Sequence, residues 1–160
     1  MTVQGSGGKQ MEYIRKFQKI DLKDVMNIWF EGNLDAHDFV PEEFWKDHFG
    51  YVSRLIPKAE VYVYEIDGKV VGFIGIDDFV IQGFFMKKEY RGKGMGTRLL
   101  NYMEELYDHF SLQVFEKNYG AILYYEKQGF QKAGEEVHED LGEVEFTYCY
   151  QRKKDGVSHL

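Results

Sequence analysis

The chain has 160 residues, of which 44% are apolar and 17% aromatic, and its formal net charge is −7. This length fits one compact domain with a continuous core, and the apolar content excludes an intrinsically disordered chain. The negative charge argues against nucleic-acid binding, which depends on clustered Lys and Arg, and suits a cationic or amine-bearing partner better.

Cys149 is the only cysteine, which excludes an internal disulfide and a cysteine-rich zinc site. The histidines show no paired metal-ligand spacing, so we expect no metal. No stretch approaches the roughly 20 apolar residues that span a bilayer, and we expect a cytoplasmic protein without membrane contact. We expect residues 1–10 to be a tag or disordered lead, residues 11–153 one domain, and residues 154–160 a tail.

The first part of the chain predicts two amphipathic helices. Asp21 is a candidate N-cap for a helix whose apolar positions recur at 3.6-residue spacing up to Trp29. After a loop over residues 32–40, Pro41 fits a first-turn position, and a second apolar stripe covers residues 44–55.

The pattern then changes to that of β-strands. Residues 61–66 and 69–76 are rich in β-branched and aromatic side chains, and Asp67-Gly68 between them favours a hairpin turn. A third strand is predicted over residues 81–86, after a turn at Asp77-Asp78.

The rest of the chain predicts, in order, a helix, a strand, a second helix and a closing hairpin. These elements cover residues 95–109, 111–115, 119–128, 130–139 and 145–151. Gly129 suits the left-handed cap that ends a helix, and Leu141-Gly142 suits the hairpin turn. The sum is an α+β fold with an antiparallel meander and one β-α-β crossover.

Residues 90–97, Tyr-Arg-Gly-Lys-Gly-Met-Gly-Thr, join the third strand to the following helix. Glycines there let the backbone approach a ligand, and the first-turn N–H groups form an anion site that fits a pyrophosphate. Arg91 and Lys93 add cations where phosphates would lie. The spacing matches neither a P-loop nor G-x-G-x-x-G, although Glu116 has the spacing of a ribose-binding acid. An ordinary tight turn is the plain alternative.

Arg91-Gly92-Lys93-Gly94-Met95-Gly96 resembles the signature Arg/Gln-x-x-Gly-x-Gly/Ala of the GNAT superfamily. The segment from Ile28-Trp29 to Asp35-Ala36-His37-Asp38-Phe39 is similar to that of a small bacterial GNAT subgroup. A second segment is similar to the family's Asn-x-x-Ala-x-x-x-Tyr-x-Lys-x-Gly-Phe motif. Its matches are Asn118, Ala121, Tyr125, Lys127, Gly129 and Phe130. Lys88 departs from the proline that many members carry. The resemblance implies a GNAT-like α+β fold, with a mixed, mostly antiparallel central sheet flanked by helices on both faces.

The resemblance further implies an acetyl-CoA-dependent N-acetyltransferase. The implied cofactor-binding residues are Phe85, Met86, Arg91, Gly92, Lys93, Gly94, Met95, Gly96, Thr97, Asn118, Ala121 and Lys127. The backbone of Phe85 and Met86 would pair with the pantetheine arm. Tyr125 would protonate the departing thiolate as catalytic acid, although packing is the alternative for this ring. Asn118 could instead cap the following helix.

The implied reaction is direct attack of a neutral primary amine, of a small molecule or peptide, on the thioester carbonyl. The candidate bases, which we do not rank, are Asp77, Asp78, Glu116 and His37. We expect Trp29, His37 and Asp38 to contact the acceptor, and Cys149 to be a buried structural thiol. The alternative function is a non-catalytic coenzyme A-binding module of the same fold. Both a monomer and a homodimer stay open.

Overall fold

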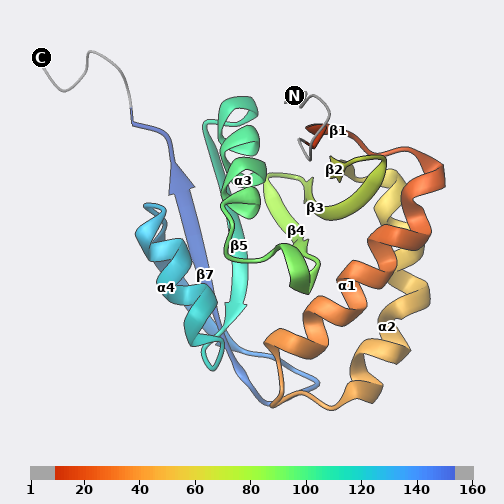
Figure 1. Cartoon of the computed structure of the whole chain (residues 1–160). Coiled ribbons are helices and arrows are strands. Elements are labelled where there is room, and N and C mark those ends of the chain that lie inside the picture. The colour runs from red at the N-terminus through yellow and green to blue at the C-terminus, as the bar shows by residue number, and fades with distance from the viewer. Residues whose placement is uncertain (1–9, 154–160) are drawn as a thin grey trace, which may run out of the picture. The chain divides into compact units, whose positions relative to one another are not determined.

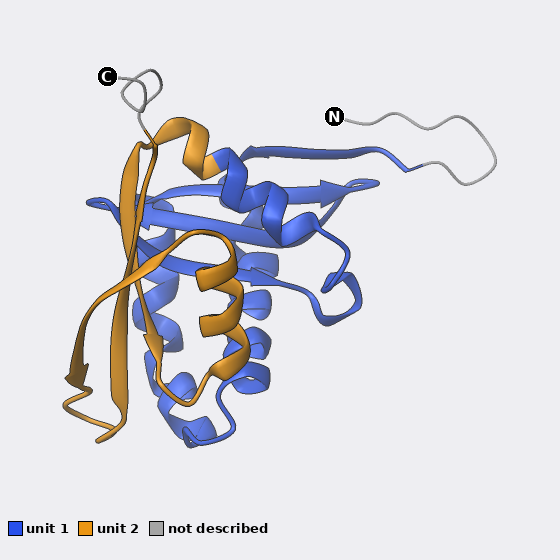
Figure 2. Ribbon diagram, turned by 90° about the vertical axis from the view of Figure 1, so that its left-hand side faces the viewer, with its two compact units in different colours: residues 1–102 blue, residues 103–160 orange. Residues whose placement is uncertain are grey.

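The computed structural model describes residues 10–153, and the chain divides into two compact units (Figures 1 and 2). Unit 1 comprises residues 1–102 and unit 2 residues 103–160. The predicted tail, and the predicted lead apart from Gln10, lie outside the described residues. The prediction of a single domain over residues 11–153 stays a prediction.

Within residues 10–102, unit 1 is built on four antiparallel strands that pair in chain order. They are β1 (Glu12–Lys16), β2 (Glu60–Ile66), β3 (Lys69–Asp77) and β4 (Val80–Met86). The predicted turn between β2 and β3 is confirmed, with φ of 49° at Asp67 and 83° at Gly68. The next turn lies one residue later than predicted, at Asp78-Phe79, because Asp77 still pairs with Val80.

Strand β1 was missing from the sequence prediction. Three of its five residues, Glu12, Arg15 and Lys16, are charged, so the segment lacks the apolar alternation that indicates a strand. It pairs with β2, and Glu12 accepts a hydrogen bond from the Tyr64 hydroxyl at 2.7 Å. This strand is therefore defined by its partner and not by its own composition.

One face of the unit 1 sheet is covered by α1 (Leu22–Ala36) and α2 (Glu42–Leu55) (Figure 1). The predicted loop over residues 32–40 is wrong at its start, because α1 continues to Ala36. Gly32 lies inside the helix, where a Cβ would stand 2.4 Å from Cδ1 of Phe85 on β4. Glycine at this position allows close packing of the helix on the strand and does not end the helix.

The opposite face of the same sheet is covered by the first part of α3 (Met95–Leu106). A Cβ at Gly96 would stand 3.6 Å from Cγ of Met86 and from Cζ of Phe84. Farther along the helix, the rings of Tyr102 and Tyr62 meet edge to face, with centroids 4.9 Å apart. Helices therefore cover both faces of the unit 1 sheet, as expected.

Within residues 103–153, unit 2 holds three antiparallel strands, in which β7 lies between β5 and β6, and one helix besides the end of α3. The elements are β5 (His109–Phe115), α4 (Tyr119–Lys127), β6 (Gln131–Val137) and β7 (Val144–Gln151). Helix α3 ends before predicted residue 109, because His109 already pairs with Gln151. Gly129 has a φ of 96° beyond α4, which confirms it as the helix-ending glycine.

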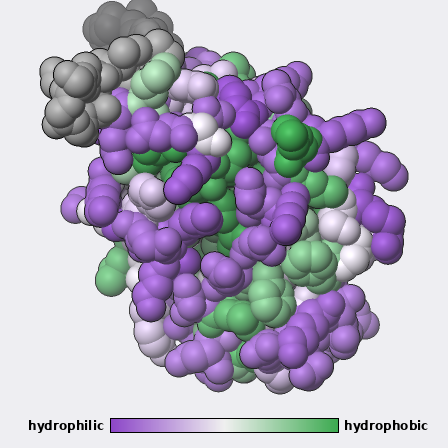
Figure 3. Space-filling model, turned by 45° about the vertical axis from the view of Figure 1, so that its right-hand side comes forward, coloured by the Kyte–Doolittle hydropathy of each residue, from purple (hydrophilic) through white to green (hydrophobic). Residues whose placement is uncertain are grey.

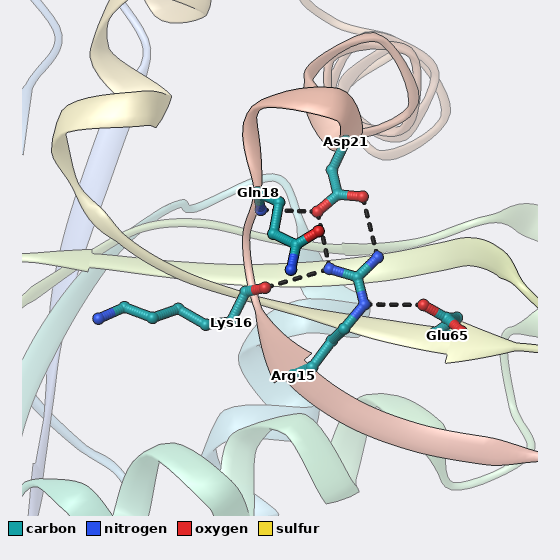
Figure 4. Close-up of polar contacts among 5 residues, drawn as sticks. All are labelled: Arg15, Lys16, Gln18, Asp21 and Glu65. Atoms are coloured by element: carbon teal, nitrogen blue, oxygen red, sulfur yellow. Dashed lines mark hydrogen bonds and ion pairs between the residues drawn. The ribbon is translucent and has the colours of Figure 1, made fainter.

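A cluster of charged groups joins β1, β2 and the start of α1 (Figure 4). Arg15 donates to both carboxylate oxygens of Asp21, at 2.8 and 2.9 Å, and from Nε to Glu65 at 2.7 Å. Asp21 is 4% exposed and Glu65 8%. The Asp21 side chain does not cap α1 as predicted, because its Oδ2 instead accepts from the Gln18 N–H at 2.7 Å. The bonds from Arg15 hold the pKa of Asp21 below its usual value.

Replacing Arg15 by Met should lower the free energy of unfolding by about 2–4 kcal/mol, because two buried carboxylates lose their cationic partner. Urea denaturation measures this loss. The difference should shrink as the pH falls through the lowered pKa of Asp21, since the protonated acid no longer needs Arg15. Lys46→Met is the matched control: its partner Glu42, at 3.0 Å, is exposed, and the loss should stay below about 1 kcal/mol. Equal losses in the two variants would contradict the role given to Arg15.

Candidate functional site

The glycine-rich turn between β4 and α3 lies within unit 1, and its backbone alternates between negative and positive φ. Gly92 has a φ of 74° and Gly94 of 86°, whereas Arg91 has −77° and Lys93 is not a positive-φ residue. Positive-φ glycines beside negative-φ residues are typical of the turns whose main-chain N–H groups bind anions. A Cβ on either glycine would meet no atom within 4 Å, so backbone conformation and not crowding requires glycine here.

The first turn of α3 extends this site. The first helical hydrogen bond runs from the Arg98 N–H to the Gly94 carbonyl at 3.1 Å. The amides of Met95 and Gly96 therefore have no helical carbonyl one turn earlier to bond, and the positive end of the helix dipole lies beside them. Residues 91–94 are exposed. The turn offers main-chain N–H groups to an anion such as a diphosphate.

The Arg91 side chain has two partners inside unit 1. Its Nε donates to the Met86 carbonyl at 2.9 Å, and its Nη1 donates to Asp35 at 3.0 Å. These bonds tie the end of β4 and the last turn of α1 to the start of the glycine turn. Sequence reasoning missed Asp35, because it lies 56 positions from Arg91 and belongs to no local motif. The Lys93 side chain is exposed, with Nζ 5.9 Å from the centroid of the Tyr90 ring.

The register of β4 shows that Phe85 and Met86 direct their backbone N–H and C=O groups to opposite edges of the strand. The Lys87 N–H donates to the Val71 carbonyl at 2.8 Å, and Phe85 lies opposite Phe73 two positions along the same ladder. Hydrogen-bonded pairs alternate in antiparallel sheets, so the N–H and C=O of Phe85 face β3. The N–H and C=O of Met86 face away from β3, and this C=O is the one that Arg91 contacts.

Tyr125 lies on α4 in unit 2. The ring is half-buried and contacts Tyr124 and Phe130, with centroid separations of 5.5 and 5.3 Å. Burial, and then the neighbouring Tyr124, raises the pKa of Tyr125 well above its ordinary value. The phenol therefore keeps its proton at neutral pH and can donate a hydrogen bond.

The other predicted residues of unit 2 also lie on α4. Asn118 caps the helix, because its side-chain oxygen accepts from the Ala121 N–H at 3.3 Å. The Ala121 amide is thus already bonded within the cap. Lys127 is exposed in the last turn.

The predicted acceptor residues differ in their surroundings. Trp29 is 6% exposed and packs edge-on against Trp45 at 5.9 Å between centroids. His37 stacks on the same Trp45 at 5.3 Å and is 9% exposed, so burial lowers the pKa of His37 to about 4. Asp38 is exposed. His37 is therefore a neutral ring in the packing of unit 1 at physiological pH.

Residues 22–130 match the Acetyltransferase (GNAT) family. The chain belongs to this family. The peptidyl-lysine N-acetyltransferase YiaC of Escherichia coli (strain K12) is 32% identical over 120 residues, which cover 73% of this chain and 82% of that protein. This GNAT chain can therefore be aligned with a protein of named activity over most of its length.

Two solved structures share the fold of this GNAT chain. The solution structure of apo-form YjaB from Escherichia coli has a TM-score of 0.79 at 23% identity, covering 89% of this chain and 99% of that chain. The crystal structure of PaiA N-acetyltransferase from Thermoplasma acidophilum, in complex with coenzyme A, has a TM-score of 0.72 at 19% identity, covering 88% and 99%. The predicted α+β GNAT fold is confirmed.

The remaining sequence expectations concern a thiol, metals and membranes. Cys149 of this GNAT protein is half-buried on β7. Within residues 10–153, no group of three or more His, Cys, Asp or Glu side chains is placed to hold a metal ion. Over the same range, no helix has both the length and the apolar character needed to cross a membrane.

Protonation of His37 should destabilise this GNAT protein in mildly acidic solution. The pKa of His37 is about 4 in the folded chain and 6.5 for an ordinary histidine, so the unfolded chain binds the extra proton between these values. The free energy of unfolding should fall by about 3 kcal/mol between these pH values as the pH drops. His37→Phe should lack this contribution in urea denaturation at pH 7 and pH 4.5. A variant that loses as much stability as the parent over this interval would contradict the prediction.

Proposed function

We propose that this GNAT protein transfers the acetyl group of acetyl-CoA to a primary amine of a peptide or small molecule. The observation that carries the proposal is the exposed turn whose alternating φ angles and first-turn amides suit a diphosphate. Family membership supports acetyl transfer. The similarity to YiaC, a peptidyl-lysine N-acetyltransferase, supports an amine acceptor.

In this proposal the main chain supplies most of the contacts to coenzyme A. The amides of residues 92–97 surround the diphosphate, and Lys93 adds a mobile positive charge. Arg91 is a positioning residue, because Asp35 and the Met86 carbonyl hold its guanidinium. The backbone of Met86, which faces away from β3, meets the pantetheine arm as an added strand would.

The proposed reaction is a direct transfer without an acyl-enzyme. The acceptor ammonium loses one proton to water or to a base, and the neutral amine attacks the thioester carbonyl. A C–N bond forms, the C–S bond breaks, and the sulfur leaves as a thiolate that gains a proton. The amide nitrogen releases its second proton. In total, one ammonium and one thioester give one amide, one thiol and one free proton, so no further reactant is needed.

Tyr125 is proposed to assist the departing sulfur. Because its pKa is raised, the phenol is a weaker acid than a tyrosine in water, and complete proton transfer to a thiolate is uphill. A hydrogen bond from the phenol that strengthens as the C–S bond breaks meets the same need, since it acts chiefly in the transition state. The phenol keeps its proton, and the thiolate takes up its own proton from solvent.

Gly94→Ala should weaken coenzyme A binding at least about tenfold, the effect of losing one charge-assisted hydrogen bond. A side chain at this positive φ costs about 1–2 kcal/mol and turns the amides away from the anion. Gly68→Ala is the matched control, because Gly68 has nearly the same φ, 83° against 86°, and equally open space. The Gly68→Ala variant should lose as much folding stability as Gly94→Ala but keep the parental affinity for coenzyme A. Isothermal titration calorimetry with coenzyme A measures the affinity of both variants. Unchanged affinity in Gly94→Ala would remove the central support of the proposal.

Tyr125→Phe should lower kcat by about 10–100-fold with little change in KM, because the lost hydrogen bond matters mainly in the transition state. Tyr124→Phe, one position earlier on α4, is the control and should keep near-parental rates. Thiol release from acetyl-CoA with a panel of amines measures these values. Coenzyme A binding without turnover on any amine would instead support a non-catalytic coenzyme A-binding module.

A further inference from the structure

Unit 1 contains a cavity of about 490 Å³ between its two N-terminal helices and the sheet. Its walls come from α1, α2, the 3₁₀ turn Ile56–Lys58 and strands β2 to β4, and include the apolar side chains of Trp29, Val61 and Phe73. The volume falls within the range of roughly 300–1,000 Å³ that small-molecule sites occupy. On the side that comes forward in Figure 3, hydrophobic side chains show in recesses among hydrophilic ones.

Two paired glycines lie on the sheet side of this cavity. Gly75 on β3 lies directly opposite Gly83 on β4, and both line the cavity. A Cβ at Gly83 would stand 3.0 Å from Cε2 of Phe73, and one at Gly75 would stand 3.2 Å from Cγ2 of Val61. The side chains of Phe73 and Val61 therefore occupy the space beside the two glycines, and the backbone of both strands borders the cavity there.

The residues that line the cavity include one positively and one negatively charged side chain without an ion-pair partner among the described residues. Lys58 and Asp77 both line the cavity and are both exposed. Among residues 10–153, neither has an ion-pair partner, in contrast to Lys46 and Arg91, which are paired with Glu42 and Asp35. A ligand that met both Lys58 and Asp77 would need an anionic and a cationic group on an apolar frame.

Strand β4 connects this cavity to the proposed cofactor site. Gly83 lies two residues before Phe85, a distance of about 7 Å along an extended strand, and Met86 follows. Asp77 pairs with Val80, three residues farther from that end of β4, so the pantetheine arm would extend back along β4 toward Gly83 to present its thioester to an amine held by Asp77.

We infer that this cavity is the acceptor pocket and that it selects primary alkylamines that also carry a carboxylate. Asp77 binds the ammonium, Lys58 binds the carboxylate, and the walls around Trp29 and Phe73 pack against the carbon chain. This inference rests on the proposed acetyl transfer and specifies its acceptor. The carboxylate belongs either to the acceptor amino acid itself or to an acidic residue beside a peptide lysine.

The test compares 6-aminohexanoate with hexylamine, which has the same chain and amine but no carboxylate. The parent should show a kcat/KM for 6-aminohexanoate about tenfold above that for hexylamine, the usual effect of one charge-assisted contact. Lys58→Gln should reduce this ratio about tenfold, whereas Asp77→Asn should raise the KM of both amines. The matched controls are Lys46→Gln and Asp47→Asn, exposed charges on α2 away from the cavity lining, which should keep the parental ratio.

Peptide acceptors distinguish the two sources of the carboxylate. End-blocked Gly-Lys-Glu is compared with end-blocked Gly-Lys-Gln, and free lysine is compared with lysine amide. A preference within the first pair assigns the carboxylate to a neighbouring acidic residue, and a preference within the second assigns it to the acceptor amino acid. Either preference, if lost in Lys58→Gln, supports the pocket.

Equal efficiency with 6-aminohexanoate and hexylamine, or an unchanged ratio in Lys58→Gln, overturns the inference and leaves the proposed acetyl transfer intact. A parent that acetylates no amine overturns the proposed transfer instead. Isothermal titration of 6-aminohexanoate into the protein without acetyl-CoA measures binding to the cavity independently of acetyl transfer. It therefore distinguishes failure of the pocket inference from failure of the proposed transfer. Binding that weakens about tenfold in Lys58→Gln and in Asp77→Asn supports the cavity as a site, and no binding excludes it.

Discussion

Close packing of β4 between two helices fixes the position of the glycine turn. Phe85 fills the space beside Gly32 on α1, while Phe84 and Met86 lie against Gly96 on α3. The turn begins where this strand ends, and the bonds of Arg91 to the Met86 carbonyl and to α1 continue the same constraint. A backbone anion site is useful only if its amides are held in place, and the strand and both helices do this within unit 1.

The three glycines of the turn are explained by different physical requirements. Gly92 and Gly94 are required by their positive φ angles. Gly96 has no positive φ, and a Cβ there would make only ordinary contacts at 3.6 Å. Neither strain nor crowding inside unit 1 therefore accounts for Gly96. In the proposed function, the absence of a side chain leaves its first-turn amide accessible to the diphosphate. In a chain with a net charge of −7, the first-turn amides and the exposed Lys93 make this turn locally attractive to an anion.

Features with a local cause were the ones that could be predicted from the sequence. Asp67-Gly68 and the cap by Asn118 each depend on neighbouring residues alone, and the structure confirms them. Gly32 misled the prediction, because its reason is the distant ring of Phe85 and not the end of a helix. The Asp78-Phe79 turn contains no glycine at all and was placed one residue early. Asp35, Arg15 and strand β1 depend on partners far along the chain, which no local pattern reveals.

In the proposed reaction, positioning contributes more than proton affinity. A carboxylate is a far weaker base than an alkylamine, so Asp77 can select and orient an ammonium but cannot by itself drive its deprotonation. The phenol of Tyr125, with its raised pKa, is likewise too weak an acid to protonate a thiolate fully. Both groups act through the bonds that they make at the moment of attack. The rate enhancement then comes chiefly from holding the amine and the thioester at near-attack distance, which effective molarities show to be worth about 7–11 kcal/mol.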